Sequence, residues 1–330
     1  MRRRKLPFVS FLVFTITFIG ITEATRTLGR ADDKFPTRPI EVIVGFAQGG
    51  GTDLMMRIIA EAAAPFLGQK MIIINKPGAG GVIGVKAVAQ AKPDGYTLGG
   101  VNPAALTMSP HISNVAYTMD DFSYITKLTE SPPVFCCNSD FFLKSAQELF
   151  EYAQNHPGKL TFACDGIGGA THFYSELIFK AKNVKLRPVP FGGAGESIKA
   201  LLGKHVDLYG GSVPPVLPHV KAGTVRGLFS LTLAGVPELP GSVGVAALGH
   251  PAIATVMWRG VIAPKGLSED RRMILQKALH KAAQTEMVIK RFKEFGEEVV
   301  ISSGTEFAEL VRKDYKAFAT VGKEMDVRKK

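Results

Sequence analysis

Three glycines followed by a threonine and an aspartate form the first segment that could bind a ligand: Gly49-Gly50-Gly51-Thr52-Asp53. The apolar run IEVIVGF before them predicts a buried strand, and DLMMRIIAEAAAPFLG after them predicts a helix. Glycines let a ligand approach the backbone closely, and the first N–H groups of a helix attract anions. We expect Thr52 or Asp53 to cap the helix. The turn therefore predicts a carboxylate site, with an ordinary strand-to-helix turn as the alternative; the charge of Asp53 disfavours a phosphate.

A second glycine-rich turn repeats this arrangement further along the chain. Residues 165–171 (DGIGGAT) follow the predicted strand LTFAC and precede the predicted helix HFYSELIFKAK. One such turn in each half of the chain predicts a cleft that binds an anion from two sides. The pair supports a ligand site more strongly than either turn alone.

The remaining motifs indicate no catalytic chemistry. The glycines of residues 77–84 lack dinucleotide-binding spacing, because Ile83 occupies the third glycine position, and we assign them to turn formation and packing. We interpret His172 as a structural residue at a helix start. No phosphate-binding loop, serine-hydrolase motif or paired metal-ligand motif occurs. We therefore expect no cofactor, no metal and no enzyme activity, although an enzyme site assembled from distant residues stays open as an alternative.

Predicted strands and helices alternate along the chain and restart after residue 131. This alternation predicts an α/β fold of two lobes, each a mainly parallel sheet flanked by helices. We assign residues 35–131 and 259–330 to the first lobe and residues 132–258 to the second. Crossings near Thr129–Pro133 and Val256–Val261 predict a hinge between the lobes.

The N-terminus has the layout of an export signal. Four basic residues, Arg2 to Lys5, precede an apolar run from Phe8 to Ile21, which is short for a membrane span. We predict a cleavable signal peptide over residues 1–24 and a periplasmic location. An uncleaved membrane anchor is the alternative.

Composition indicates a globular protein, with 46% hydrophobic and 21% charged residues. The formal net charge of +11 is scattered rather than gathered into a basic patch with aromatic residues, so we expect no nucleic-acid partner. A mild positive field attracts anionic solutes instead. We expect Cys136, Cys137 and Cys164 to be buried free thiols, with a disulfide from Cys164 to one of the pair as the alternative.

The sequence resembles the substrate-binding proteins of tripartite tricarboxylate transporters, the Bug (Bordetella uptake gene) family. The match runs from about Phe35 to Val327 through a series of ordered blocks: FPTRPIEVIVGF, GGGTD, NKPGAGGVIG, PDGYTL, DDFSYIT, NHPGKLTF, GIGGATH, RPVPFGG, ALLGKHVDLYGG, VKAGTVRGL, WRGVIAPKG and GTEFAELVRKDYKAF. The resemblance implies a two-lobed, periplasmic-binding-protein-like (flytrap) fold. It also implies that backbone amides and waters from two loops, one per lobe, hold the ligand carboxylate.

Carried onto this chain, the resemblance gives two loops, at residues 46–53 and 166–171, and an aromatic residue facing the cleft. The implied ligand-binding residues are Phe46, Gly49, Gly50, Gly51, Thr52, Asp53, Gly166, Gly168, Gly169, Ala170, Thr171 and Phe191. Three glycines depart from the family pattern: Gly45 replaces a usual Pro, Gly169 a common Ser, and Gly192 a usual Lys or Arg. These departures leave the identity of the ligand open.

The implied function is that of an extracytoplasmic solute-binding protein. It would capture a small carboxylate (a tricarboxylate, dicarboxylate, aromatic acid or amino acid) and deliver it to the membrane subunits of a tripartite tricarboxylate-type transporter. We expect it to be a monomer. The alternatives are a sensing module that presents its ligand-bound form to a sensor kinase ectodomain, and an extracytoplasmic enzyme using the same cleft.

Overall fold

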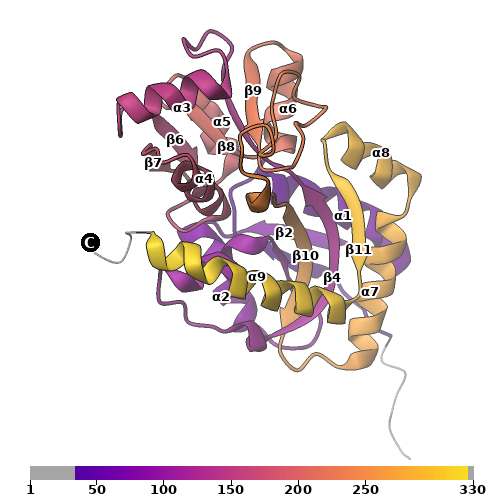
Figure 1. The fold of residues 1–330 in the computed structure, drawn as a ribbon. Coiled ribbons are helices and arrows are strands. Elements are labelled where there is room, and N and C mark those ends of the chain that lie inside the picture. The colour runs from indigo at the N-terminus through magenta and orange to yellow at the C-terminus, as the bar shows by residue number, and fades with distance from the viewer. Residues whose placement is uncertain (1–33, 326–330) are drawn as a thin grey trace, which may run out of the picture. The chain divides into compact units, whose positions relative to one another are not determined.

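Two β-sheets organise the chain in the computed structural model, which describes residues 34–325 (Figure 1). The described residues from Pro36 onward form one compact unit. The predicted signal peptide, residues 1–24, lies outside the described residues. None of the helices within residues 34–325 is long and apolar enough to cross a membrane.

The first sheet has six strands in the order β11-β4-β10-β3-β1-β2. Its strands come from both ends of the unit: β1 (Ile40–Val44), β2 (Met71–Asn75), β3 (Thr97–Val101), β4 (Phe122–Ser131), β10 (Met257–Pro264) and β11 (Glu298–Ser302). The second sheet has five strands in the order β7-β6-β8-β5-β9. They come from the middle of the chain: β5 (Pro133–Asn138), β6 (Thr161–Cys164), β7 (Arg187–Pro190), β8 (Leu208–Ser212) and β9 (Val225–Ser230).

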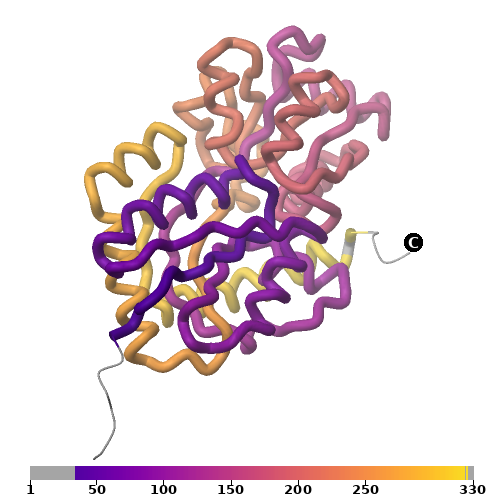
Figure 2. Tube along the Cα trace, turned by 180° about the vertical axis from the view of Figure 1, so that it is seen from behind, coloured from indigo at the N-terminus to yellow at the C-terminus, as the bar shows by residue number. Residues whose placement is uncertain are grey.

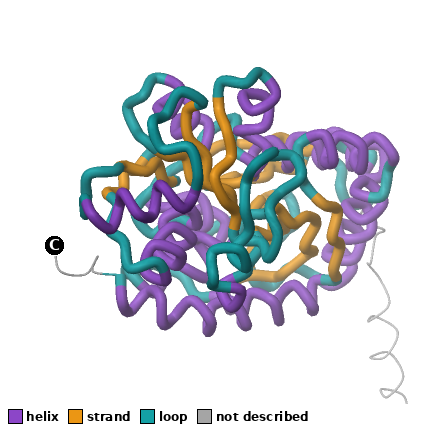
Figure 3. The backbone as a smooth tube through the Cα atoms, turned by 45° about the horizontal axis from the view of Figure 1, so that its top comes forward, coloured by secondary structure: helices purple, strands orange, loops and turns teal. Residues whose placement is uncertain are grey.

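Helices flank both sheets, and the strands lie inside them (Figure 3). Those beside the first sheet are α1 (Gly51–Leu67), α2 (Val82–Ala89), α7 (Glu269–Ala283), α8 (Glu286–Glu294) and α9 (Gly304–Glu324). Those beside the second are α3 (Ala146–Asn155), α4 (Ala170–Ala181), α5 (Ala194–Leu202) and α6 (Val213–Lys221). Short helical turns complete the fold: η1 (Ala79–Gly81), η2 (Ala104–Met108), η3 (Ser109–His111), η4 (Met119–Asp121) and η5 (Pro251–Ile253).

The two-lobed α/β fold is confirmed, but both sheets are mixed rather than mainly parallel. In the first sheet β1 pairs in parallel with β2 and β3, whereas β10 is antiparallel to β3 and β4. In the second, β6 is parallel to β7 and β8, whereas β5 is antiparallel to β8 and β9. The antiparallel strands are those by which the chain leaves and re-enters a sheet: β4 runs directly into β5, and β10 returns beside β4. Each antiparallel pair joins strands that lie far apart in the chain, so counting local helix–strand alternations could not reveal their relative direction.

The chain passes between the sheets at two places. β4 ends at Ser131 and β5 begins at Pro133, and the chain re-enters the first sheet at Met257. Figure 2 shows the consequence: the indigo-to-purple and yellow segments lie together in one lobe, and the magenta-to-orange segment forms the other.

Each lobe has its own apolar core. Trp258 and Phe307, in contact edge to face, lie in the core of the first lobe, and Leu201 and Tyr209 lie in that of the second. The Trp258 indole N–H donates to Asp314 at 2.7 Å. The three cysteines are buried free thiols, as predicted (Cys136, Cys137 and Cys164).

Candidate functional site

The first glycine-rich turn lies at the N-terminus of α1, directly after the buried strand β1. The helix begins at Gly51 with Gly50 as its N-cap, so the prediction that Thr52 or Asp53 caps it is wrong. Both residues belong to the first helical turn. The glycines make this earlier start possible, since Gly49 adopts a φ of 83°, a left-handed conformation that side chains disfavour.

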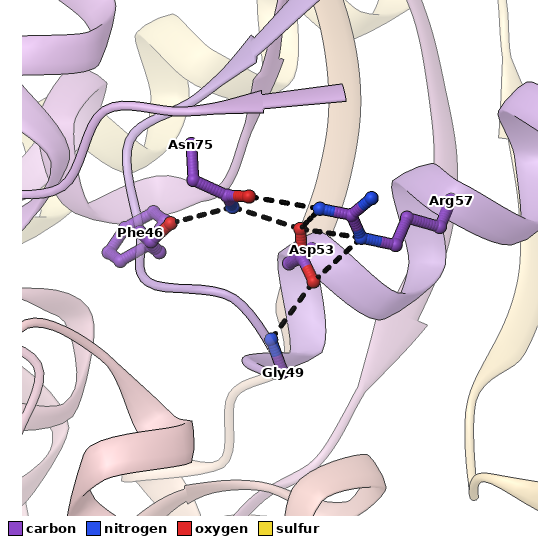
Figure 4. Close-up of polar contacts among 5 residues, drawn as sticks. All are labelled: Phe46, Gly49, Asp53, Arg57 and Asn75. Carbon is purple, nitrogen blue, oxygen red and sulfur yellow. Dashed lines mark hydrogen bonds and ion pairs between the residues drawn. The ribbon is translucent and has the colours of Figure 1, made fainter. Parts of the chain in front are cut away.

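The Asp53 side chain stabilises the first glycine-rich turn through hydrogen bonds and an ion pair (Figure 4). Its buried carboxylate accepts the Gly49 N–H at 2.9 Å and pairs with Arg57. Asn75, at the end of β2, donates to Asp53 at 2.9 Å and to the carbonyl of Phe46, also at 2.9 Å. Asp53 therefore holds the Gly49 end of the loop 46–49, and Asn75, bound to Asp53, holds the Phe46 end.

A small cavity of about 30 Å³ lies between the two lobes at this helix N-terminus. Residues of both sheets line it: Phe46, Gly50, Gly51, Thr52, Asn102, Asp165, Thr171, Ala194, Gly211, Ser212, Met257 and Arg259. Five of the twelve predicted site residues are among them (Phe46, Gly50, Gly51, Thr52 and Thr171). The other seven are outside the lining of this cavity in the described structure (Gly49, Asp53, Gly166, Gly168, Gly169, Ala170 and Phe191).

The glycines of the second turn bring the two lobes into contact. A Cβ on Gly80 would lie 2.9 Å from backbone atoms of Gly169, and a Cβ on Gly166 would lie 2.9 Å from the Gly80 nitrogen. Ser109 of η3 donates to the Gly168 carbonyl at 2.8 Å. Across the cleft, the Ala47 N–H donates to the Gly192 carbonyl at 3.1 Å. The glycines of residues 78–81 thus do act in turns and close packing.

His172 has a structural role. The residue is 4% exposed, and its Nδ1 accepts the Gly168 N–H at 3.1 Å, which assigns the proton to Nε2. Burial lowers the pKa of His172 to about 4, so the ring is neutral and holds the second turn in place.

The two predicted aromatic residues lie in different surroundings. Phe46 is buried in the cavity wall, and its ring packs against Gly81, where an added Cβ would lie 2.9 Å from the ring. Phe191 packs against the apolar core of the second lobe. Phe191 is therefore not part of the cavity lining, to which Ala194, three residues further along, contributes. Gly45 cannot carry a side chain, since a Cβ there would lie 2.6 Å from the Gly81 carbonyl oxygen.

A buried arginine, which sequence analysis did not select, lies at the N-terminus of α1. Arg259 of β10 is 1% exposed and lines the cavity. Its Nη1 pairs with the buried carboxylate of Glu297, its Nη2 contacts only the weakly accepting sulfur of Met257 at 3.6 Å, and its Nε has no partner in the described structure. A Cβ on Gly51 would collide with Nη2. A cation therefore lies against the positive end of a helix with N–H groups unsatisfied, an arrangement that favours a bound anion.

Asp165 provides the opposite charge in the same cavity. It follows β6 directly, and its Oδ1 accepts the Thr171 N–H at 3.0 Å. The N-terminus of α4 is thus already occupied by a carboxylate of the chain itself. Burial raises the pKa of Asp165 to about 6, and the hydrogen bond from Thr171 opposes this rise.

Most of the unpredicted lining residues lie at strand ends. Asn102 follows β3, Asp165 follows β6, and Ser212 ends β8. Ligands of α/β proteins bind beyond the carboxyl ends of strands, so this rule could have found them. For Arg259 the only sequence signal was a charged residue within the apolar strand WRGVIAP.

A larger cavity, of about 950 Å³, lies between the ends of β4 and β11 and the loop 232–238. Its charged lining residues are one lysine, Lys293, and four glutamates: Glu130, Glu238, Glu297 and Glu298. This lining repels anions, and the candidate carboxylate site is therefore the small cavity.

Comparison with known proteins agrees with this geometry. The model of a family described as the tripartite tricarboxylate transporter family receptor matches residues 55–327. The chain belongs to this family. It is 30% identical over 314 residues to protein BugT of Bordetella pertussis, covering 94% of this chain and 96% of BugT.

Solved structures of this receptor family superpose closely. The periplasmic binding protein BugD matches with a TM-score of 0.82 and 29% identity over 89% of this chain and 99% of BugD. MatC from Rhodopseudomonas palustris, solved with bound malate, matches with a TM-score of 0.83 and 28% identity over 87% of this chain and all of MatC. The chain is thus a solute-binding receptor of the Bug type.

Proposed function

We propose that this receptor is a periplasmic binding protein that captures a small carboxylate in the cavity between its lobes. It then delivers the ligand to the membrane subunits of a tripartite tricarboxylate-type transporter. The observation that carries the proposal is the Arg259 guanidinium, buried beside the N-terminus of α1 with its Nε unpaired. The malate bound to MatC supports a carboxylate as the ligand class.

The ligand's carboxylate would lie between Arg259 and the first turn of α1. The first N–H groups of a helix have no acceptor within the helix, and the residues that carry them here, Gly51 and Thr52, line the cavity. Hydrogen bonds to a charged group contribute roughly 1.5–3 kcal/mol each. The Glu297 carboxylate keeps Arg259 from being an isolated buried charge in the empty protein.

Ligand entry would require the lobes to separate. The cavity holds about 30 Å³, whereas ligand pockets have volumes of roughly 300–1,000 Å³. Opening would break the contacts of Ala47 with Gly192 and of Ser109 with Gly168. We propose one lobe of residues 35–131 and 257–330 and another of residues 132–256. This keeps the division expected from the sequence except that Met257 and Trp258 go with strand β10 of the first sheet.

We propose binding without catalysis, by a monomer. The cavity lining in the described structure contains neither histidine nor cysteine, so it offers no nucleophile paired with an imidazole base. A ligand recovered chemically unchanged after long incubation supports this; a product would contradict it.

A thermal-shift screen tests the proposed function. The mature protein is tested with carboxylates, with the primary amides of the same acids as neutral controls, and with sugars and polyamines. A ligand that binds only the folded state raises the free energy of unfolding by roughly 2.7 kcal/mol at a hundredfold excess over Kd. We expect stabilisation by one or more carboxylates and none by their amides. Stabilisation by sugars or polyamines alone would contradict the proposal.

A further inference from the structure

The cavity presents two opposite charges, one from each sheet. Arg259 belongs to β10 of the first sheet, and Asp165 follows β6 of the second. Only one of the two charges has an ion-pair partner among the described residues. Glu297 pairs with Arg259, whereas no lysine or arginine within residues 34–325 forms an ion pair with Asp165.

The position of Asp165 depends on Gly169. A Cβ on Gly169 would collide with Oδ1 of Asp165, so the missing side chain makes room for the carboxylate. The carboxylate then accepts the Thr171 N–H, one of the α4 N-terminal groups that would otherwise be available to an anionic ligand. The second lobe therefore presents a hydrogen-bond acceptor to the cavity where a glycine turn alone would present donors.

A ligand that matches both lobes must carry a carboxylate and, close to it, a positively charged donor. Its carboxylate meets the Arg259 guanidinium at the start of α1, a group that is 1% exposed and whose Nε has no partner in the described structure. Next to Asp165, a second carboxylate would be repelled. A hydroxyl would donate a hydrogen bond but leave the charge of Asp165 unneutralised, whereas an ammonium group would both donate a hydrogen bond and neutralise the charge.

We propose that this receptor is selective for a zwitterionic amino acid, whose carboxylate binds Arg259 and the N-terminus of α1 and whose ammonium group binds Asp165. This inference rests on the proposed function, since it assumes that the cavity is the ligand site. Burial of Asp165, which raises its pKa to about 6, supports it, because a carboxylate that is costly to ionise in the empty site gains most from a bound cation.

The test uses ligands that differ only at carbon 2. Each of the nineteen common amino acids with a primary amine is titrated calorimetrically beside the acid with a hydroxyl in place of the 2-amino group and the deamino acid with a hydrogen there; aspartate, malate and succinate form one such set. We expect at least one amino acid to bind tenfold or more tightly than both counterparts. If no amino acid binds tenfold or more tightly than both its hydroxy and its deamino counterparts, and some of these acids bind, the selectivity is overturned and the proposed carboxylate function is left intact. Binding of no member of any set overturns the inference, and the carboxylate screen then decides separately on the proposed function.

Two variants assign the selectivity to Asp165. D165N keeps the shape and an acceptor for Thr171 but removes the charge, so the preference for the amino over the hydroxy acid falls at least tenfold while the hydroxy acid binds no more weakly than before. D140N is the control. It removes the charge of an exposed aspartate that pairs with Lys204, and it should keep the preference for the amino acid. An unchanged preference in a folded D165N protein overturns the assignment.

Discussion

The carboxylate of Asp165 occupies the space that a side chain on Gly169 would need. The two positions are therefore coupled, and a substitution at one changes what the other can accept. This explains a departure seen in the sequence: the glycine that replaces a common serine leaves room for a charged group.

The coupling predicts a specific double-mutant result. G169S forces the Asp165 carboxylate out of its place and should lower stability by about 1–3 kcal/mol, the usual cost of overpacking. In a D165A background the serine no longer meets the carboxylate, but its Cβ still lies 2.7 Å from the backbone carbonyl oxygen of residue 165, so only part of the cost disappears. We expect a coupling free energy of roughly 0.5–3 kcal/mol. Urea unfolding of the four proteins measures this. Additive effects would show that the two side chains do not compete for the same space.

Asp53 is predicted to support the site without touching ligand. D53N removes the charge that pairs with Arg57 and weakens the acceptor of the Gly49 N–H, so we expect a loss of about 1–3 kcal/mol in stability and a weaker affinity for carboxylate. D120N, at an exposed ion pair with Arg312, is the control and should change neither quantity. Unchanged stability in D53N would contradict the role given to the network of Figure 4.

Asp165 and His172 give opposite dependences of stability on pH. The pKa of Asp165 is raised from 3.8 to about 6, so the folded protein binds this proton more tightly than the unfolded chain. Its contribution to stability is full below pH 3.8 and is lost as the pH rises to about 6. The pKa of His172 is lowered from 6.5 to about 4, so its contribution is full above pH 6.5 and is lost as the pH falls to about 4.

Because these effects partly cancel in the unmodified protein, the variant D165N is needed to separate them. We expect the stability of D165N relative to the unmodified protein to rise between pH 4 and 6 and to level off above pH 6. Denaturation curves at half-unit intervals of pH would show it. A relative stability that falls over this interval would mean that the folded environment favours the ionised form of Asp165.

Much of this arrangement could be predicted from the sequence. The α/β pattern gave two lobes, and the GGGTD turn gave the N-terminus of α1, because strand-to-helix turns of glycines have local signatures. The second turn was located correctly, but its glycines contact the first lobe. These contacts are made with Gly80, which is 86 to 89 residues away in the chain, and a local sequence pattern cannot predict them. Arg259 lies opposite Gly51 because β10 returns to the first sheet, and only the tertiary fold brings the two together.

Closure of the lobes is predicted to accompany binding. The ligand contacts groups from both sheets, so it favours a state in which the opened lobes have closed around it. Small-angle scattering should show a smaller radius of gyration at ligand saturation. Unchanged scattering would mean that ligand enters without a separation of the lobes, contrary to the opening that the small cavity implies.

The most direct test of the account is calorimetric titration of the carboxylate found by the screen into R259Q/E297Q. The double substitution removes the buried ion pair as a unit, which avoids leaving one charge unpaired and lets the protein fold. E297Q alone is the control for position 297: it leaves Arg259 without its ion-pair partner and should be less stable, but its folded form should bind carboxylate at least as tightly as the unmodified protein. We predict that R259Q/E297Q melts cooperatively and binds about 100-fold more weakly, a loss of about 2.7 kcal/mol. A folded R259Q/E297Q protein with undiminished affinity would contradict the central claim that Arg259 binds the ligand's carboxylate.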